Sequence, residues 1–369
     1  MTDFAKRVTS IDISGIRKMF EAAGPNAINM GLGQPDFDTP ENIKAAAVRA
    51  IEEGKTGYTN NAGIDELRAA VADKLKRENG LEYTPKQVLI TAGGSGALHA
   101  AISSLIDEGD KVVFNNPGFV SYGSLAKLAG GAPAPVALRP DLHLDVEALK
   151  EEFSDKKTKV MVLNSPANPT GMVETEETIR AVVEAAADYG VTVLSDEVYE
   201  KFCYGDTKFV SAAKFGDNVV TINAVSKTYA MTGWRVGFMA GAEEIVEQAV
   251  KIQQYSLACP TSIAQYAALE AYTGDQSSVD AMRAEYAARR NLLITGLRDM
   301  GVDVAMPEGA FYAFPKLDAE TVSKIVANDV IITPGLAFGS LGDGYARMSY
   351  AASQDNIREA LKRIQQVVE

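Results

Sequence analysis

The sequence has few of the residue types that hold metals or disulfides together. Its 369 residues include two cysteines, two histidines and one tryptophan. Two thiols make no disulfide framework, so we expect a reducing, cytoplasmic setting. Neither an HExxH nor a CxxC motif occurs in the sequence, and we therefore expect no transition-metal site.

Long apolar runs and an excess of positive charge are also missing. No apolar run reaches the ~18 residues of a membrane span. The segment from Met1 to Arg7 lacks the apolar core of a signal peptide. The 36 lysine and arginine residues are outnumbered by 49 aspartate and glutamate residues, which gives a net charge of −13. Because an acidic surface repels phosphate backbones and anionic lipid, we expect neither nucleic acid nor a membrane as a partner.

What the sequence does contain is a globular composition arranged in an alternating pattern. Hydrophobic residues make up 46% and charged residues 23%, which excludes a disordered chain and a coiled coil. Short β-rich apolar runs alternate with helical stretches between about residues 65 and 270. The runs are 88–91, 111–114, 160–163, 191–194, 219–222 and 236–239. Because polar residues do not alternate with the apolar ones, these runs predict strands buried on both faces, in an α/β domain with a mostly parallel sheet.

The pattern changes after about residue 270. A long helix is predicted over 279–300, followed by short apolar segments and a final helix over 355–368. The apolar segments are 310–314, 330–332 and 345–350. Length and pattern together predict two domains. We expect a large domain over 31–275, a smaller α+β domain over 276–369, and an N-terminal arm over 1–30 that joins the small domain.

Polar residues follow several of the predicted strands. In open α/β sheets, ligands bind outside the carboxyl ends of the strands. Gly94-Ser95-Gly96 follows the first run, the segment 164–171 follows the third, Asp196 and Tyr199 follow the fourth, and Lys227 follows the fifth. Together these residues predict a site for a flat, polar and anionic ligand.

The glycines after the first run have two interpretations. Backbone N–H groups of Gly94-Ser95-Gly96 can bind an anion at the positive end of the following helix. Alternatively, the glycines form only a tight turn between a strand and a helix. The segment does not match the dinucleotide motif GxGxxG, and the Walker pattern GxxxxGK[ST] occurs nowhere.

Asp196 and Lys227 are the two charged candidates at the strand ends. An unpaired carboxylate after a buried strand costs free energy, so Asp196 is expected to face a cation or several donors. The alternative is a helix N-cap or a loop acid. A buried lysine near another cation has a pKa below the usual ~10.4, which makes its amine a nucleophile. Arg235 can supply that charge beside Lys227, although most lysines lie at the surface.

The segment from Ser226-Lys227 to Thr232-Gly233-Trp234-Arg235-Val236-Gly237 resembles the lysine signature of class I aminotransferases. These enzymes are of fold type I and use pyridoxal 5'-phosphate (PLP). Six further segments resemble the family in the right order over nearly the whole chain: 33–37, 58–68, 164–171, 195–199, 309–312 and 347–350. The resemblance is to the aspartate and aromatic aminotransferase subgroup, and it implies a three-layer large domain with a smaller α+β domain at the C-terminus.

The resemblance implies roles at the cofactor. Lys227 would bind PLP covalently and, once freed by substrate, would carry the proton between the substrate Cα and the cofactor as general base and acid. Asp196 would pair with the pyridine nitrogen, and Tyr199 and Asn168 would bond the phenolic oxygen. The other implied cofactor contacts are the ring-stacking Phe119, the phosphate ligands Gly94, Ser95, Gly96, Ser226 and Arg235, and the partner subunit's Tyr58.

The resemblance also implies how the substrate and a second subunit are bound. Arg347 would bind the substrate α-carboxylate through two parallel hydrogen bonds, with Gly33 letting the backbone approach the same group. Asn168 is the third residue implied to bind the substrate. A structural salt bridge is the alternative for Arg347. Tyr58 reaching the partner's phosphate implies a homodimer with shared active sites, whereas interface packing alone is the alternative.

Three positions depart from the family pattern and leave the substrate open. Ala224 stands where serine or glycine is usual, and Phe119 stands where tyrosine or tryptophan is common. Ser95 stands where some relatives with acidic substrates carry lysine. We expect an aminotransferase that moves an amino group between an L-amino acid and a 2-oxo acid, with 2-oxoglutarate as the acceptor. Aspartate is the first expectation as donor, and aromatic or alanine-type donors are the alternatives because of Ser95.

Two further functions are compatible with parts of this pattern. A PLP-dependent C–S β-lyase on the same fold would share Lys227 and Arg347, because fold does not determine reaction. A non-enzymatic PLP-binding regulator would need a DNA-binding module. The segments that resemble aminotransferases use almost the whole chain and leave no basic helix-turn-helix segment for it.

Overall fold

The computed structural model describes residues 3–12, 24 and 26–368. Part of the predicted N-terminal arm, residues 13–23 and 25, lies outside the described residues. Within the arm, the short helix α1 (Lys6–Thr9) packs near α6 (Ser121–Leu128). Among the described residues, no helix has the length and apolar character needed to cross a membrane.

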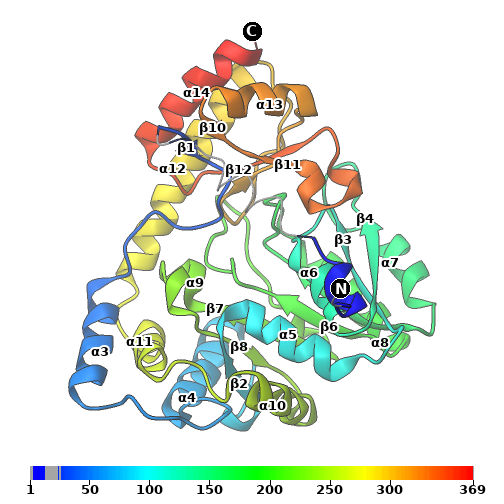
Figure 1. Cartoon of the computed structure of the whole chain (residues 1–369), viewed down its shortest axis with the longest axis vertical. Helices are drawn as coiled ribbons and strands as arrows, with labels where there is room; N and C mark the ends of the chain where they lie inside the picture. The colour runs from blue at the N-terminus through cyan, green and yellow to red at the C-terminus, as the bar shows by residue number, and fades with distance from the viewer. Residues whose placement is uncertain (1–2, 13–23, 25, 369) are drawn as a thin grey trace.

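A seven-stranded sheet forms the centre of the first two thirds of the chain (Figure 1). Its strands lie in the order β2-β8-β7-β6-β5-β3-β4, and β8 runs antiparallel to both of its neighbours while the other pairs are parallel. The prediction of a mostly parallel sheet is therefore confirmed. The strands are β2 (Val88–Thr91), β3 (Lys111–Asn116), β4 (Ala132–Ala137), β5 (Thr158–Asn164), β6 (Thr192–Asp196), β7 (Val219–Ala224) and β8 (Gly237–Ala240).

The apolar strands are buried on both faces because helices cover each side of the sheet. Val160 and Val162 of β5 face a core with α5, α6 and α10, whereas Met161 and Leu163 face a second core with α7 and α8. This alternation explains why the runs carry no polar residues. The helices of this part are α3 (Glu41–Glu52), α4 (Asp65–Lys74), the π-helix Leu75–Asn79, α5 (Gly93–Leu105), α6, α7 (Val146–Phe153), α8 (Glu176–Asp188), α9 (Val225–Thr228), α10 (Glu243–Leu257) and α11 (Ser262–Thr273).

The last third of the chain forms two small sheets packed with helices. β1 (Ile28–Asn29) pairs in parallel with β10 (Val330–Ile331). The long helix lies beside the C-terminal helix, as Figure 1 shows at the top of the molecule. The elements are α12 (Ser277–Asp299), β9 (Tyr312–Ala313), α13 (Ala319–Ala327), β10, β11 (Thr333–Pro334), β12 (Ala346–Ser349) and α14 (Gln354–Val368), with the strand order β11-β12-β9.

Two details differ from the sequence-based expectations. Strand β4 was not predicted, because its sequence APAPVA contains two prolines; it lies at the edge of the sheet, where a strand can lack ladder donors. The apolar segment 310–314 yields only the two-residue strand β9. Ala310 has a φ of +55°, and this left-handed residue interrupts the extended backbone.

His143 lies between two carboxylates, of which Glu174 is buried, and contacts segments that are distant in the sequence. It lies in the turn between β4 and α7, with Nδ1 3.4 Å from Glu174 Oε2 and Nε2 3.9 Å from Glu308 Oε2. The contact with Glu174, and the charges of Glu308 and Asp141, raise the pKa of His143 against the effect of burial. When it is protonated, the imidazole lies between two carboxylates and stabilises the packing of residue 308 against residue 174.

We expect replacement of His143 by asparagine to destabilise the protein more in mild acid than in mild base. Because the folded-state pKa of His143 is raised, its contribution is fully present below the unfolded-state pKa of ~6.5 and is lost as the pH rises through the folded-state pKa. Chemical denaturation of the wild type and the variant at about pH 5 and about pH 9 measures this difference. An equal loss of unfolding free energy at both pH values would contradict the assignment.

Candidate active site

A cavity of about 260 Å³ opens beside the carboxyl ends of β5, β6 and β7. Asn164, Asp196 and Ala224 are the last residues of these strands, and all three line it. The predicted site residues that line this cavity are Gly33, Gly94, Ser95, Phe119, Asn168, Asp196, Tyr199, Ser226, Lys227, Arg235 and Arg347. The cavity is also lined by residues that were not among the predicted site residues: Leu32, Leu98, Tyr122, Asn164, Val198, Ala224, Thr232 and Tyr312.

Lys227 lies on α9, the single helical turn that follows β7. Its Nζ donates a hydrogen bond to the Gly33 carbonyl at 2.6 Å. Burial, followed by the charges of Arg347 and Arg235, lowers the pKa of Lys227 to about 8, and Asp196 opposes the shift. The lowered pKa makes the unprotonated amine, the form that a nucleophile or general base requires, more accessible near neutral pH than in an ordinary lysine.

Asp196 is the last residue of β6, and only one of its two carboxylate oxygens accepts a hydrogen bond from the described residues. Tyr122 donates its hydroxyl to Asp196 Oδ2 at 2.8 Å. Oδ1 is buried and has no hydrogen-bond partner among the described residues. Burial raises the pKa of Asp196 to about 6, although the bond from Tyr122 and the charge of Lys227 lower it. A cationic donor placed against Oδ1 would lower this pKa and favour the ionised carboxylate.

Anion-binding groups converge at the start of α5. Gly93 is the first residue of this helix and has a φ of +73°. The guanidinium of Arg235 lies against it, so that a Cβ on Gly93 would come within 2.6 Å of Arg235 Nη2. The hydroxyl-bearing residues Ser95 and Thr232 also line the cavity. A permanent cation beside a helix N-terminus suits a phosphate group.

Arg347 lies deep in the site without a carboxylate partner. It is 2% exposed, its Nη1 donates to Asn168 Oδ1 at 2.9 Å, and its Nη2 donates to the Gly31 carbonyl. The guanidinium also stacks over Tyr312, 4.5 Å from the ring centre. Its Nε has no partner, and no acidic side chain among the described residues forms an ion pair with it. A buried cation held only by neutral groups can accept a carboxylate from a ligand.

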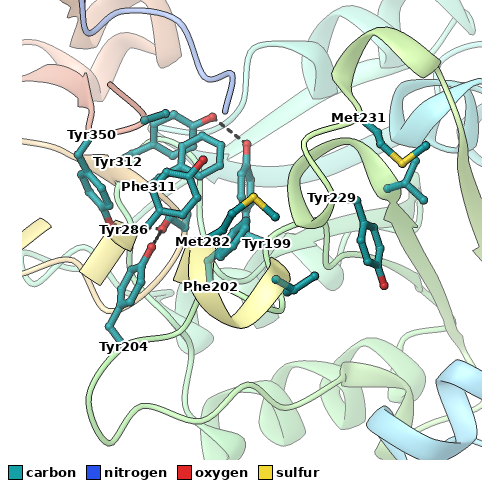
Figure 2. Packing of buried hydrophobic residues seen from close by; sticks show 14 of the residues in the cluster. Tyr199, Phe202, Tyr204, Tyr229, Met231, Met282, Tyr286, Phe311, Tyr312 and Tyr350 are labelled. Carbon is teal, nitrogen blue, oxygen red and sulfur yellow. Dashed lines mark hydrogen bonds between the residues drawn. The ribbon is translucent and has the colours of Figure 1, made fainter. Parts of the chain in front are cut away.

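Tyr199 is fixed by other aromatic side chains. Its hydroxyl bonds the Tyr312 hydroxyl at 2.9 Å, the contact that Figure 2 marks with a dashed line. Phe311 packs edge-to-face against the Tyr199 ring, with the centroids 5.4 Å apart. Burial, followed by Tyr312, raises the pKa of Tyr199, so its hydroxyl stays protonated. Gly33 lies against the Tyr312 hydroxyl, because a Cβ on Gly33 would lie only 2.0 Å from that oxygen.

Two predicted site residues do not line the cavity. Gly96 lies within the first turn of α5, because the helix begins at Gly93 and not at Ala97 as the sequence suggested. A Cβ on Gly96 would contact Ala92 at 3.4 Å, which indicates close packing at the helix start. Tyr58 is 92% exposed and is absent from the cavity lining of its own chain.

Sequence reasoning missed three polar residues that order the site. Tyr122 carries the hydroxyl that holds Asp196. Asn164 Oδ1 accepts the backbone N–H of Asn168 at 2.8 Å, and its Nδ2 donates to the Asp196 carbonyl at 2.9 Å. Tyr312 bonds Tyr199 and stacks on Arg347. Asn164 lies in the strand-end segment 164–171 and Tyr312 in the family-like segment 309–312, but neither was given a role of its own, and nothing local distinguished Tyr122 from a core tyrosine.

Comparison with known proteins places the chain in one family. Residues 25–364 match the family model of the class I and II aminotransferases. The chain is 43% identical to the probable aspartate aminotransferase of Methanocaldococcus jannaschii, over 99% of this chain and 100% of that one. It is 39% identical to aromatic-amino-acid aminotransferase 2 of Thermococcus litoralis, over 98% and 97%. The aspartate aminotransferase of Thermus thermophilus with maleate superposes with a TM-score of 0.95 at 34% identity, covering 100% of both chains.

The chain therefore belongs to the class I and II aminotransferases. It is a PLP-dependent transaminase of fold type I, as the resemblance implied. The described residues fit that cofactor on three observations. Asp196 Oδ1 is buried without a partner, the Arg235 guanidinium covers Gly93 at the start of α5, and the Lys227 amine has a lowered pKa between these two ends.

Proposed function

We propose that the chain is an aspartate aminotransferase that uses 2-oxoglutarate as its acceptor. The observation that carries the binding of an amino acid is Arg347, a buried guanidinium with neutral partners and a free Nε that shares the cavity with Lys227. The choice of aspartate is supported by the relative named probable aspartate aminotransferase and by the similar structure that was solved with maleate, a dicarboxylate.

The site residues divide between the cofactor and the substrate in this proposal. When bound, PLP supplies an electron sink for the pair of electrons left at the substrate Cα. Lys227 Nζ would take the Cα proton as general base and then give it up as general acid. Arg347 binds the substrate α-carboxylate, and Gly33 lies beside that carboxylate. The residues proposed to hold the cofactor are Asp196, Tyr199, Asn168, Phe119, Gly94, Ser95, Gly96, Ser226 and Arg235, joined by the partner subunit's Tyr58.

Asp196 has a defined electrostatic task in this reaction. Its buried Oδ1 is proposed to pair with the protonated ring nitrogen, which keeps the ring able to accept negative charge. Tyr122 holds Oδ2 and so sets the direction of the carboxylate. Phe119 packs edge-to-face on Tyr122, with ring centroids 5.5 Å apart, and is proposed to stack on the cofactor ring.

We also propose a homodimer in the cytoplasm, with the large domain over 31–275 and the small domain over 276–369. Tyr58, exposed over 92% of its surface, supports a role in the partner's site because it contributes nothing to its own cavity. The domain division is supported by the separate seven-stranded and three-stranded sheets. The two free cysteines support a reducing compartment.

A donor panel tests the proposed substrate. We expect kcat/KM with 2-oxoglutarate to be highest for aspartate and lower by about tenfold or more for phenylalanine, tyrosine and alanine. A higher value for an aromatic donor would replace aspartate with an aromatic substrate and leave the reaction class intact. The panel also includes cysteine: release of sulfide, pyruvate and ammonia from it, with no 2-oxo acid added as acceptor, would instead identify a β-lyase.

A further inference from the structure

A buried cluster of charged and amide side chains lies behind the two segments that carry Tyr199 and Lys227. It consists of Lys74, Asn79, Glu200 and Asn223, which are 1%, 4%, 8% and 3% exposed. None of the four lines the cavity, and none has a role in the proposed function. We call these residues the Glu200 cluster.

Three donors from three different elements converge on the Glu200 carboxylate. Lys74, the last residue of α4, and Asn223 of β7 both donate to Oε1, the latter at 2.9 Å. Asn79 donates to Oε2 at 2.9 Å, and its own Oδ1 accepts from Lys74 Nζ at 2.8 Å. Every member of the cluster is therefore bonded to at least one other, and the carboxylate is the common acceptor.

The cluster depends on a local departure from regular helix geometry. Residues 75–79 form a π-helix directly after Lys74, and Asn79 is its last residue. The wider turn brings Asn79 to the same carboxylate as Lys74. Such π-helical turns are frequent at functional sites, because they redirect side chains at a cost in helix stability.

Burial of the ion pair between Lys74 and Glu200 adds little to the free energy of folding. Desolvation of two buried charges offsets most of their attraction, and an apolar pair of similar volume is often at least as stable. A fully bonded polar cluster does, however, hold its elements in one arrangement. Here two of the elements carry proposed site residues. Glu200 directly follows Tyr199, and Asn223 lies in β7, four residues before Lys227.

We propose that Glu200 is a positioning residue of the transamination reaction. Held by Lys74 and Asn79, it fixes the end of β7 through Asn223 and thereby sets the Lys227 amine relative to the Tyr199 hydroxyl. The proposal rests on the roles given above to Lys227 and Tyr199. It predicts that loss of the cluster impairs the proton transfer at Cα more than substrate binding, because Arg347 is held by Asn168 and Gly31 instead.

Glu200→Gln tests the proposal in the PLP-loaded enzyme, assayed with its best amino donor. Glutamine keeps the shape but replaces one acceptor with a donor, which then opposes a donor of Asn79 or Lys74 whichever way the amides turn. We expect kcat to fall by about tenfold or more with KM for the donor within about twofold. We also expect a shift in the pH midpoint of the visible absorption change of bound PLP.

A matched control and a second variant complete the test. Glu78→Gln removes a carboxylate that lies 2.8 Å from Lys201 and 3.7 Å from Lys74 and is not bonded to Asn223, so it is expected to leave kcat and the midpoint unchanged. Asn223→Ala removes the bond between Glu200 and β7, together with the bond that Asn223 Oδ1 accepts from the Ala224 N–H at 2.7 Å. This variant carries the test if Glu200→Gln fails to fold. Variants that lose thermal stability but keep the wild-type kcat and midpoint would overturn the proposal. Failure of the wild type to transaminate any donor would instead refute the proposed function.

Discussion

Replacement of Lys227 by alanine is expected to lower kcat by about a thousandfold or more, because both the covalent attachment and the acid–base group are lost. The fold is expected to persist, since the one hydrogen bond found for Nζ runs to the Gly33 carbonyl. Steady-state assays of the variant loaded with PLP measure the loss, and circular dichroism checks the fold.

Lys251→Ala is the matched control for this loss. Lys251 is an exposed lysine on α10 whose Nζ bonds Gln248, so we expect wild-type activity from the variant. Near wild-type activity in Lys227→Ala would remove Lys227 from the chemistry. The assignment of the cavity as the active site would then have to be abandoned.

Arg347→Lys is expected to weaken every amino acid donor by a similar factor. Lysine keeps the charge but cannot form two parallel hydrogen bonds to a carboxylate. The loss of one charged hydrogen bond corresponds to about 1.5–3 kcal/mol, or roughly 10- to 150-fold in kcat/KM. The measurement compares kcat/KM for aspartate, glutamate and phenylalanine in the wild type and the variant.

The pattern across donors decides what Arg347 binds. An equal loss for all three donors follows from contact with the α-carboxylate, the group that they share. A loss confined to aspartate and glutamate would place Arg347 at the distal carboxylate instead. Arg283→Lys serves as the control, because Arg283 is an exposed arginine paired with Asp280, outside the cavity.

The central strands could be predicted from sequence because each is an apolar run buried by helices on both faces. Six of the seven strands were found in this way, and their carboxyl ends led to Asp196 and Lys227. Strand β4 was missed because its prolines oppose a strand assignment unless the strand lies at a sheet edge, and edge position is a property of the whole sheet.

The arrangement of the site depends on contacts that no local pattern contains. Tyr122 lies 74 residues from Asp196, and Arg347 lies 179 residues from Asn168, yet each pair is hydrogen bonded. The resemblance to a family supplied Arg347 as a candidate. Only the structure shows that Arg347 is buried with neutral partners, and that Gly96 belongs to the packed first turn of α5.

A single-turnover experiment tests the central claim, that this cavity transfers an amino group, most directly. The PLP-loaded enzyme is mixed with excess aspartate and no 2-oxo acid, and the oxaloacetate released is counted per protomer. We expect about one equivalent, a matching change in the visible absorption, and its reversal with formation of glutamate when 2-oxoglutarate is added. Continuous release of a 2-oxo acid together with ammonia, or no release with any amino acid, would contradict the claim.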